Sequence, residues 1–181
     1  MTEPSPAAPS FTVLAKETAV SSPEWGRVEE LASGLRDHIA LAETRALVVE
    51  ANQPSLASTG VQAAITPFLA SCGFQSEAKG LFAGYEPRNL RPDFYLPVGG
   101  SGVLLEVERG KTIDNNMDLL DLWKTHICRG ADHLFLLVPT EYRSNPAKPA
   151  RNLFRAVEAR LSTFFEPANH TNVESVFLFG Y

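Results

Sequence analysis

Apolar residues recur at helical spacing in several segments of the chain. Between residues 21 and 44, Val28, Leu31, Leu35 and Ile39 fall on one face of a helix. Each such helix is expected to bury its apolar face against a sheet. The same spacing predicts further helices over 61–73, 112–128 and 151–165.

The helix at 112–128 has a clear apolar stripe. Met117, Leu120, Trp123 and Ile127 share one of its faces. We therefore expect this stripe, Trp123 included, to pack against the core.

Shorter apolar runs predict the strands. The segment 133–139 is almost continuously apolar, which is typical of a central strand buried on both faces. Residues 74–82 alternate as a half-buried strand does, and 173–181 predict a further strand. Residues 91–97 and 102–109 flank a Gly-Gly pair, which predicts a hairpin.

The order of these segments predicts an α/β fold with one mixed central sheet. Three consecutive strands form a meander, and a helical crossover then leads to the buried strand, so helices should cover both faces. Segment 45–50 fits a short strand or a helix equally well. We expect residues 11–181 to form a single domain and residues 1–10, which are rich in Pro, Ala and Ser, to be a disordered tail.

Composition and charge narrow the function classes. The 181 residues are 44% hydrophobic and 20% charged, with no apolar run long enough to span a bilayer. No signal-peptide pattern opens the chain, so a cytoplasmic protein is expected. The net charge of −5 argues against a protein that holds nucleic acid through a large basic surface. This charge is compatible with an enzyme that has a local basic strip and places acidic groups in a metal site.

The predicted hairpin carries carboxylates on one face. Side chains alternate along a strand, so Glu106 and Glu108 point to the same side, and Asp93 shares a face with Tyr95 in the preceding strand. Adjacent strands are about 4.8 Å apart and alternate residues about 6.6 Å apart. If Asp93 faces the same side, three carboxylates surround a space that suits one or two divalent ions. The alternative is a strand end with solvated acids.

The same residues resemble a known signature. "RPDFYL" followed by "GVLLEVERGK" is similar to the PD-(D/E)xK motif of the restriction-endonuclease-like nuclease superfamily, in its E-x-E variant. The resemblance extends over 59–139 and implies a restriction-endonuclease-like core. It also implies Mg²⁺-dependent (or Mn²⁺-dependent) cleavage of phosphodiester bonds, with DNA as the favoured substrate. Asp93, Glu106 and Glu108 match the metal ligands, and Glu108 is alternatively the base.

The chain departs from the usual family pattern in its lysine. Glu108 occupies the position where most members have one, and the resemblance offers two replacements. Lys111 follows three residues later, and Lys124 lies on the next helix, to which some members move this charge. The alternative for Lys124 is a surface ion pair with Asp121, at i, i+3 spacing.

Basic residues near the last helix form a candidate nucleic-acid contact. They belong to an ordinary solvated face or bind DNA phosphates. Glu50 and Glu77 are weaker candidates for the further acid that some family members use, and His126 and His133 are expected to be structural. The four basic residues are Arg143, Lys148, Arg151 and Arg155.

Three functions are compatible with the sequence. The first is a Mg²⁺-dependent endonuclease, for which a homodimer would suit double-strand cutting. The second is a catalytically silent domain of the same fold that binds DNA or protein. The third is a phosphoesterase acting on small substrates, which would need a closed pocket.

Overall fold

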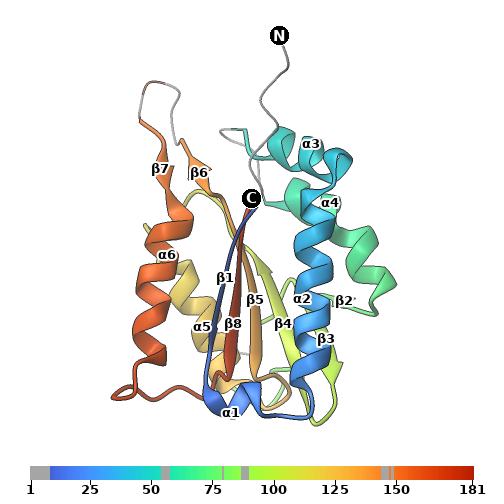
Figure 1. Ribbon diagram of the computed structural model, residues 1–181, viewed down its shortest axis with the longest axis vertical. Helices are drawn as coiled ribbons and strands as arrows, with labels where there is room; N and C mark the ends of the chain where they lie inside the picture. Colours follow the sequence, from blue (N-terminus) through green and yellow to red (C-terminus); the bar gives the residue numbers. More distant parts are fainter. Residues whose placement is uncertain (1–8, 54–57, 79, 87–89, 144–146, 148) are drawn as a thin grey trace.

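The chain folds around a six-stranded mixed sheet (Figure 1). The computed structural model describes residues 9–53, 58–78, 80–86, 90–143, 147 and 149–181. The three strands in the middle, β8, β5 and β4, run parallel, and the outer pairings are antiparallel. Across the sheet, the strands are β1 (Ser10–Ala15), β8 (Ser175–Gly180), β5 (His133–Val138), β4 (Ser101–Val107), β3 (Phe94–Val98) and β2 (Gln75–Ser76).

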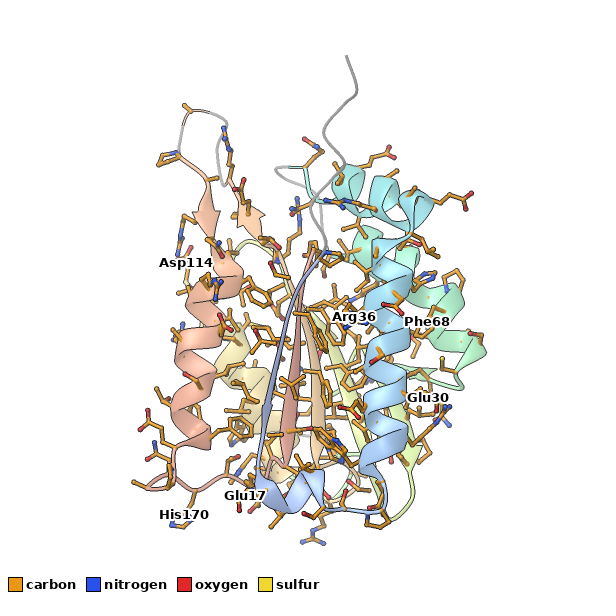
Figure 2. All side chains as sticks on the ribbon, viewed as in Figure 1. Glu17, Glu30, Arg36, Phe68, Asp114 and His170 are labelled. Carbon is orange, nitrogen blue, oxygen red and sulfur yellow. The ribbon has the colours of Figure 1, made fainter. Side chains whose placement is uncertain are left out.

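Helices cover both faces, and side chains fill the space between each helical layer and the sheet (Figure 2). One face packs against α2 (Trp25–Ala40), α3 (Ala42–Ala51) and α4 (Thr59–Ser71). The other packs against α5 (Met117–Ile127) and α6 (Leu153–Ser162). Among the described helices, none has both the length and the apolar character needed to cross a membrane.

Four short elements complete the chain. A single turn of helix follows β1, and a 3₁₀ turn extends α6. A two-stranded ribbon stands beside the sheet edge at which β8 ends (Figure 1). These elements are α1 (Glu17–Val20), η1 (Thr163–Phe165), β6 (Glu141–Tyr142) and β7 (Arg151–Asn152).

The predicted fold class is confirmed, with differences in detail. The meander β2–β3–β4 leads through α5 to β5, and segment 45–50 is helical as part of α3. The strand predicted over 74–82 is reduced to two exposed residues. The edge strand β1, which begins at Ser10, was not predicted from the sequence. Residues 1–8 of the predicted tail lie outside the described residues.

The hairpin has the alternation that the sequence predicts. Phe94 pairs with Leu105, which places Asp93 directly opposite Glu106. Leu105 and its i±2 neighbours lie in the core under α2 and α4, whereas Leu104 lies in the core under α5 and α6. The acids therefore emerge on the α5 face, at the edge where the parallel strands end.

The orientation of α5 differs from the prediction that its apolar stripe packs against the core. Trp123 is 40% exposed and Leu120 is 37% exposed, so the middle of this stripe faces outward, whereas Ile127 is partly buried against the core. The opposite face is the buried one, although it is largely polar. Its buried residues are Asp118, Asp121, Leu122, Lys124 and Thr125.

Candidate active site

Four carboxyl groups and one ammonium group meet where β3, β4 and α5 come together. We call Asp93, Glu106, Glu108 and Asp121 the acidic cluster. Asp93 immediately precedes β3, Glu106 lies in β4, and Glu108 directly follows β4. Asp121 and the lysine beside it, Lys124, come from the buried face of α5.

Asp93 and Glu106 are joined across the hairpin by backbone hydrogen bonds. The backbone N–H of Asp93 donates to Glu106 Oε2 over 3.3 Å, and the Val107 N–H donates to Asp93 Oδ2 over 2.8 Å. These bonds fix two carboxylates side by side. Burial raises the pKa of both, and the neighbouring Asp121 charge raises that of Glu106 further.

Lys124 lies between two carboxylates. Its Nζ donates to Glu106 Oε1 over 2.6 Å and lies 2.8 Å from Asp121 Oδ1. Only 7% of the residue is exposed, so the surface ion pair considered as an alternative is wrong. Burial alone would lower the pKa of Lys124, but the Asp121 and Glu106 carboxylates raise it above its usual value. Lys124 is therefore a permanent cation within the acidic cluster.

Lys111, the other candidate, lies differently. It is exposed in the turn after β4, and none of its described contacts reaches the acidic cluster. The lysine associated with the acids is thus the one on the helix.

Glu108 and Asp121 are neighbouring carboxyls, and the pKa of each is raised. Burial and the Asp121 charge raise the pKa of Glu108 to about 8. Burial also raises the pKa of Asp121, to about 6, while Lys124 and the hydrogen bond with Glu108 oppose the rise. The acidic cluster thus gathers four carboxyl groups beside a single ammonium group, that of Lys124.

Asp93 and Glu106 are the residues that could hold a divalent cation with few protein ligands. Within the described ranges, no three His, Cys, Asp or Glu side chains are arranged to enclose a metal ion. Mg²⁺, however, is usually held by one or two carboxylates and completes its shell with water and phosphate oxygens. Asp93 and Glu106 provide such a pair.

The predicted basic strip is only partly available. Arg151 binds Asp114, which lies near the start of α6 (Figure 2), and Arg155 binds Glu158, each pair at 2.9 Å. Arg143 is exposed, and Lys148 lies outside the described residues. Contact between these residues and DNA stays a prediction.

The helix before the meander contributes an amide rather than an acid. Gln62 of α4 hydrogen-bonds to the Asp93 carboxylate. Glu50 and Glu77 are both exposed, and Glu77 pairs loosely with Arg91 at 3.8 Å. Glu50 therefore does not join the acidic cluster, whereas Glu77 borders it: its N–H donates to the Asp93 carbonyl over 2.9 Å, and its charge raises the pKa of Asp93.

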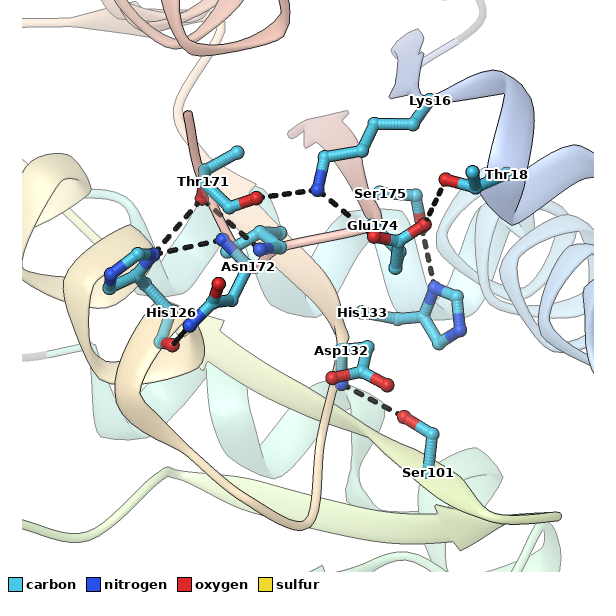
Figure 3. A network of polar contacts seen from close by, with 11 residues as sticks. Lys16, Thr18, Ser101, His126, Asp132, His133, Thr171, Asn172, Glu174 and Ser175 are labelled. Atoms are coloured by element: carbon cyan, nitrogen blue, oxygen red, sulfur yellow. Dashed lines mark hydrogen bonds and ion pairs between the residues drawn. The ribbon is translucent and has the colours of Figure 1, made fainter. Parts of the chain in front are cut away.

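A second polar network lies at the opposite end of the strands (Figure 3). His133 Nδ1 lies 2.8 Å from Ser175 Oγ, and Lys16 pairs with Glu174 at 2.9 Å. Ser175 is fully buried, and burial lowers the pKa of His133. This network joins strand ends, and Ser175 is not accessible as a nucleophile.

Sequence reasoning missed Asp121 and Gln62 as parts of the site. The signal for Asp121 was its i, i+3 spacing from Lys124, which is the same on a surface helix and a buried one. No signal in the sequence marks Gln62, because its contact depends on how α4 packs.

Comparisons with known proteins support the fold. No family model matches the sequence, and no curated protein matches it. Among solved structures, the chain is similar to restriction endonuclease BglII, determined in complex with a DNA 16-mer. The TM-score is 0.52 with 12% sequence identity, over 95% of this chain and 77% of the other. The likeness is one of fold, which is restriction-endonuclease-like.

Proposed function

We propose that the protein is a divalent-metal-dependent nuclease that hydrolyses phosphodiester bonds, with DNA as its substrate. The observation that carries this proposal is the buried placement of Lys124 against Glu106, with Asp93 fixed beside the same carboxylate. Carboxylates that can hold a divalent ion, with a cation beside them, are groups that can support metal-assisted phosphoryl chemistry. The restriction-endonuclease-like fold is consistent with that chemistry.

Each residue has a role in this proposal. Asp93 and Glu106 hold the ion, and Lys124 orients the attacking water or the phosphate. Glu108 is the base that takes a proton from that water, or a further ligand of the ion. When bound, the divalent ion stabilises negative charge on the phosphate oxygens and lowers the pKa of a coordinated water.

Isosteric variants test the assignment. Asp93→Asn and Glu106→Gln should each reduce Mg²⁺-dependent cleavage of plasmid DNA by on the order of a hundredfold or more. The control is Glu50→Gln, which removes an exposed acid from α3. Thermal unfolding should show that all three variants are folded. Cleavage at the wild-type rate by both site variants would refute the proposal.

A specific observation favours a second candidate, a catalytically silent domain that binds DNA or protein. Lys124 already compensates part of the buried negative charge, as a structural ion pair would. Calorimetric titration of Mg²⁺ or Mn²⁺ into wild type and Glu106→Gln separates the two functions. A nuclease requires metal binding that weakens in the variant. No affinity, or equal affinity in both proteins, favours the silent domain.

A further inference from the structure

Arg109 is a buried positive charge without a carboxylate partner in the described structure. Lys124 and Arg109 are the two buried cationic side chains among the described residues, 7% and 9% exposed. Lys124 has two carboxylates within 3 Å, whereas no described carboxylate lies within ion-pair distance of Arg109. The one acidic residue outside the described ranges is Glu3. Buried charges are normally paired, so this guanidinium calls for an anion.

The surroundings of Arg109 hold the guanidinium in place and leave donors free. Its Nη2 donates to the Gln53 carbonyl, and its Nε has no acceptor among the described residues. The Tyr142 ring covers it, with 6.0 Å between the guanidinium carbon and the ring centroid. Tyr142 can lie this close because it packs directly against Gly110, which has no side chain.

Two neighbours of Arg109 line a cavity. Gln53 and Tyr181 line a cavity of about 470 Å³ between α3 and the end of β8. The Tyr181 hydroxyl donates to the carbonyl of Glu108 over 2.6 Å. Burial raises the pKa of Tyr181, and the Arg109 charge opposes this rise, which places the guanidinium close to the phenol. Because Arg109 directly follows Glu108 in the chain, an anion bound at its guanidinium would lie near the acidic cluster.

We propose that Arg109 binds a phosphate group of the nucleic-acid backbone next to the one that is cleaved. Guanidinium groups bind phosphate oxygens through paired donors, and a phosphate would neutralise the unpaired charge. The identity of this ligand rests on the proposed nuclease function. Arg109 acts as a positioning residue that sets the register of the strand in the site.

DNA binding tests this role separately from cleavage. A short fluorescent DNA duplex is titrated with the full chain in Ca²⁺, and its anisotropy is followed at several salt concentrations. Arg109→Gln should weaken binding roughly tenfold, as expected for one lost charged hydrogen bond. The slope of log affinity against log salt should fall by about one. Arg109→Lys should keep the slope but lose part of the affinity.

The control is Arg27→Gln, which removes an exposed arginine from α2 that pairs with Glu30. Its affinity and salt slope should equal those of wild type. Unchanged affinity and slope in folded Arg109→Gln would overturn the proposal.

Thermal unfolding with inorganic phosphate distinguishes anion binding from a structural role. Phosphate should raise the melting temperature of wild type but not of Arg109→Gln. Without phosphate, the variant should be at least as stable as wild type, because an unpaired buried charge is removed. A destabilised variant with no phosphate effect in either protein would mean that Arg109 is structural, and would overturn the proposal.

The two proposals can fail independently. If wild type cleaves no DNA but phosphate stabilises it through Arg109, the nuclease function fails and the anion site stands. If wild type cleaves DNA and Arg109→Gln binds and cleaves it equally well, the anion site alone fails.

Discussion

Lys124 provides one positive charge to two buried carboxylates, Glu106 and Asp121. Lys124→Met would leave both carboxyls buried without a counter-ion. Removing one partner of a buried pair typically costs about 3–5 kcal/mol, so urea unfolding should show a loss of that order. The loss should shrink at low pH, where the carboxyls take up protons, and DNA cleavage should disappear.

Asp121 provides the matched control for that variant. Adding Asp121→Asn to Lys124→Met removes one unpaired charge and should restore much of the stability without restoring cleavage. If Lys124→Met alone is as stable as wild type, the ion pair is unimportant for folding.

The raised pKa of Glu108 predicts how the stability of the protein depends on pH. A carboxyl whose pKa is higher in the folded than in the unfolded protein stabilises the fold while it is protonated. The stability is complete below the unfolded value near 4.5 and is lost as pH rises through about 8. The Asp121 carboxyl contributes to the pH dependence of stability in the same direction, because its pKa in the folded protein is about 6. The free energy of unfolding should therefore fall between pH 4.5 and pH 8.

Denaturant unfolding across this pH range checks the prediction. Glu108→Gln should flatten the curve, mostly at its upper end, because a neutral amide does not titrate. Glu50→Gln should follow wild type, since Glu50 is exposed on α3. A Glu108→Gln curve as steep as that of wild type would place the titration elsewhere.

At the scale of elements, the β3–β4 hairpin could be predicted from the sequence. Which face of α5 is buried against the sheet could not. Alternation fixes which side chains of a strand share a face, so the pairing of Asp93 with Glu106 follows from the sequence once the turn is located. For α5, apolar periodicity marks Trp123 as buried, yet the helix buries Asp121 and Lys124 instead. Burying these charges is favourable only opposite the acids of β4, and that long-range partner is invisible in helical periodicity.

The ribbon β6–β7 reaches the site through the contact of Tyr142 with Gly110. A methyl group at position 110 would overlap the Tyr142 ring, so Gly110→Ala should push that ring away from Arg109. The expected loss of stability is about 1 kcal/mol, from crowding and the lost cation–π contact. Thermal unfolding measures it.

The double variant Gly110→Ala, Tyr142→Ala tests this contact. Without the ring, the added methyl group should cost little, whereas Tyr142→Phe should leave the overlap in place. Equal costs of Gly110→Ala in all three backgrounds would show that the ring is not what occupies this space.

At the scale of the molecule, net charge sets the conditions for DNA binding. The chain carries a net charge of −5, and the acidic cluster adds local repulsion where DNA would approach. A divalent ion at Asp93 and Glu106 should reverse that repulsion. We therefore expect Ca²⁺ to strengthen binding of a DNA duplex on the order of tenfold in wild type and far less in Glu106→Gln. Anisotropy in Ca²⁺ against EDTA measures this difference, and equal responses would contradict it.

The sheet as a whole was largely predictable, because its central strands are buried on both faces and read as continuous apolar runs. β1 was not, because it is an edge strand of six residues with a weak alternation and pairs only with β8, far away in the chain. Gln62 and Arg109 were missed for a similar reason. Their environments are made by segments that meet only in the folded molecule.

The position of Lys124 on a helix has a consequence for recognising proteins of this kind. The chemical signature is divided among three elements: Pro-Asp before one strand, Glu-x-Glu at the end of the next, and Asp-x-x-Lys on the following helix. A search pattern that demands a lysine on the strand passes over this chain. A pattern that joins these three pieces, with a variable interval before the helix, matches this chain.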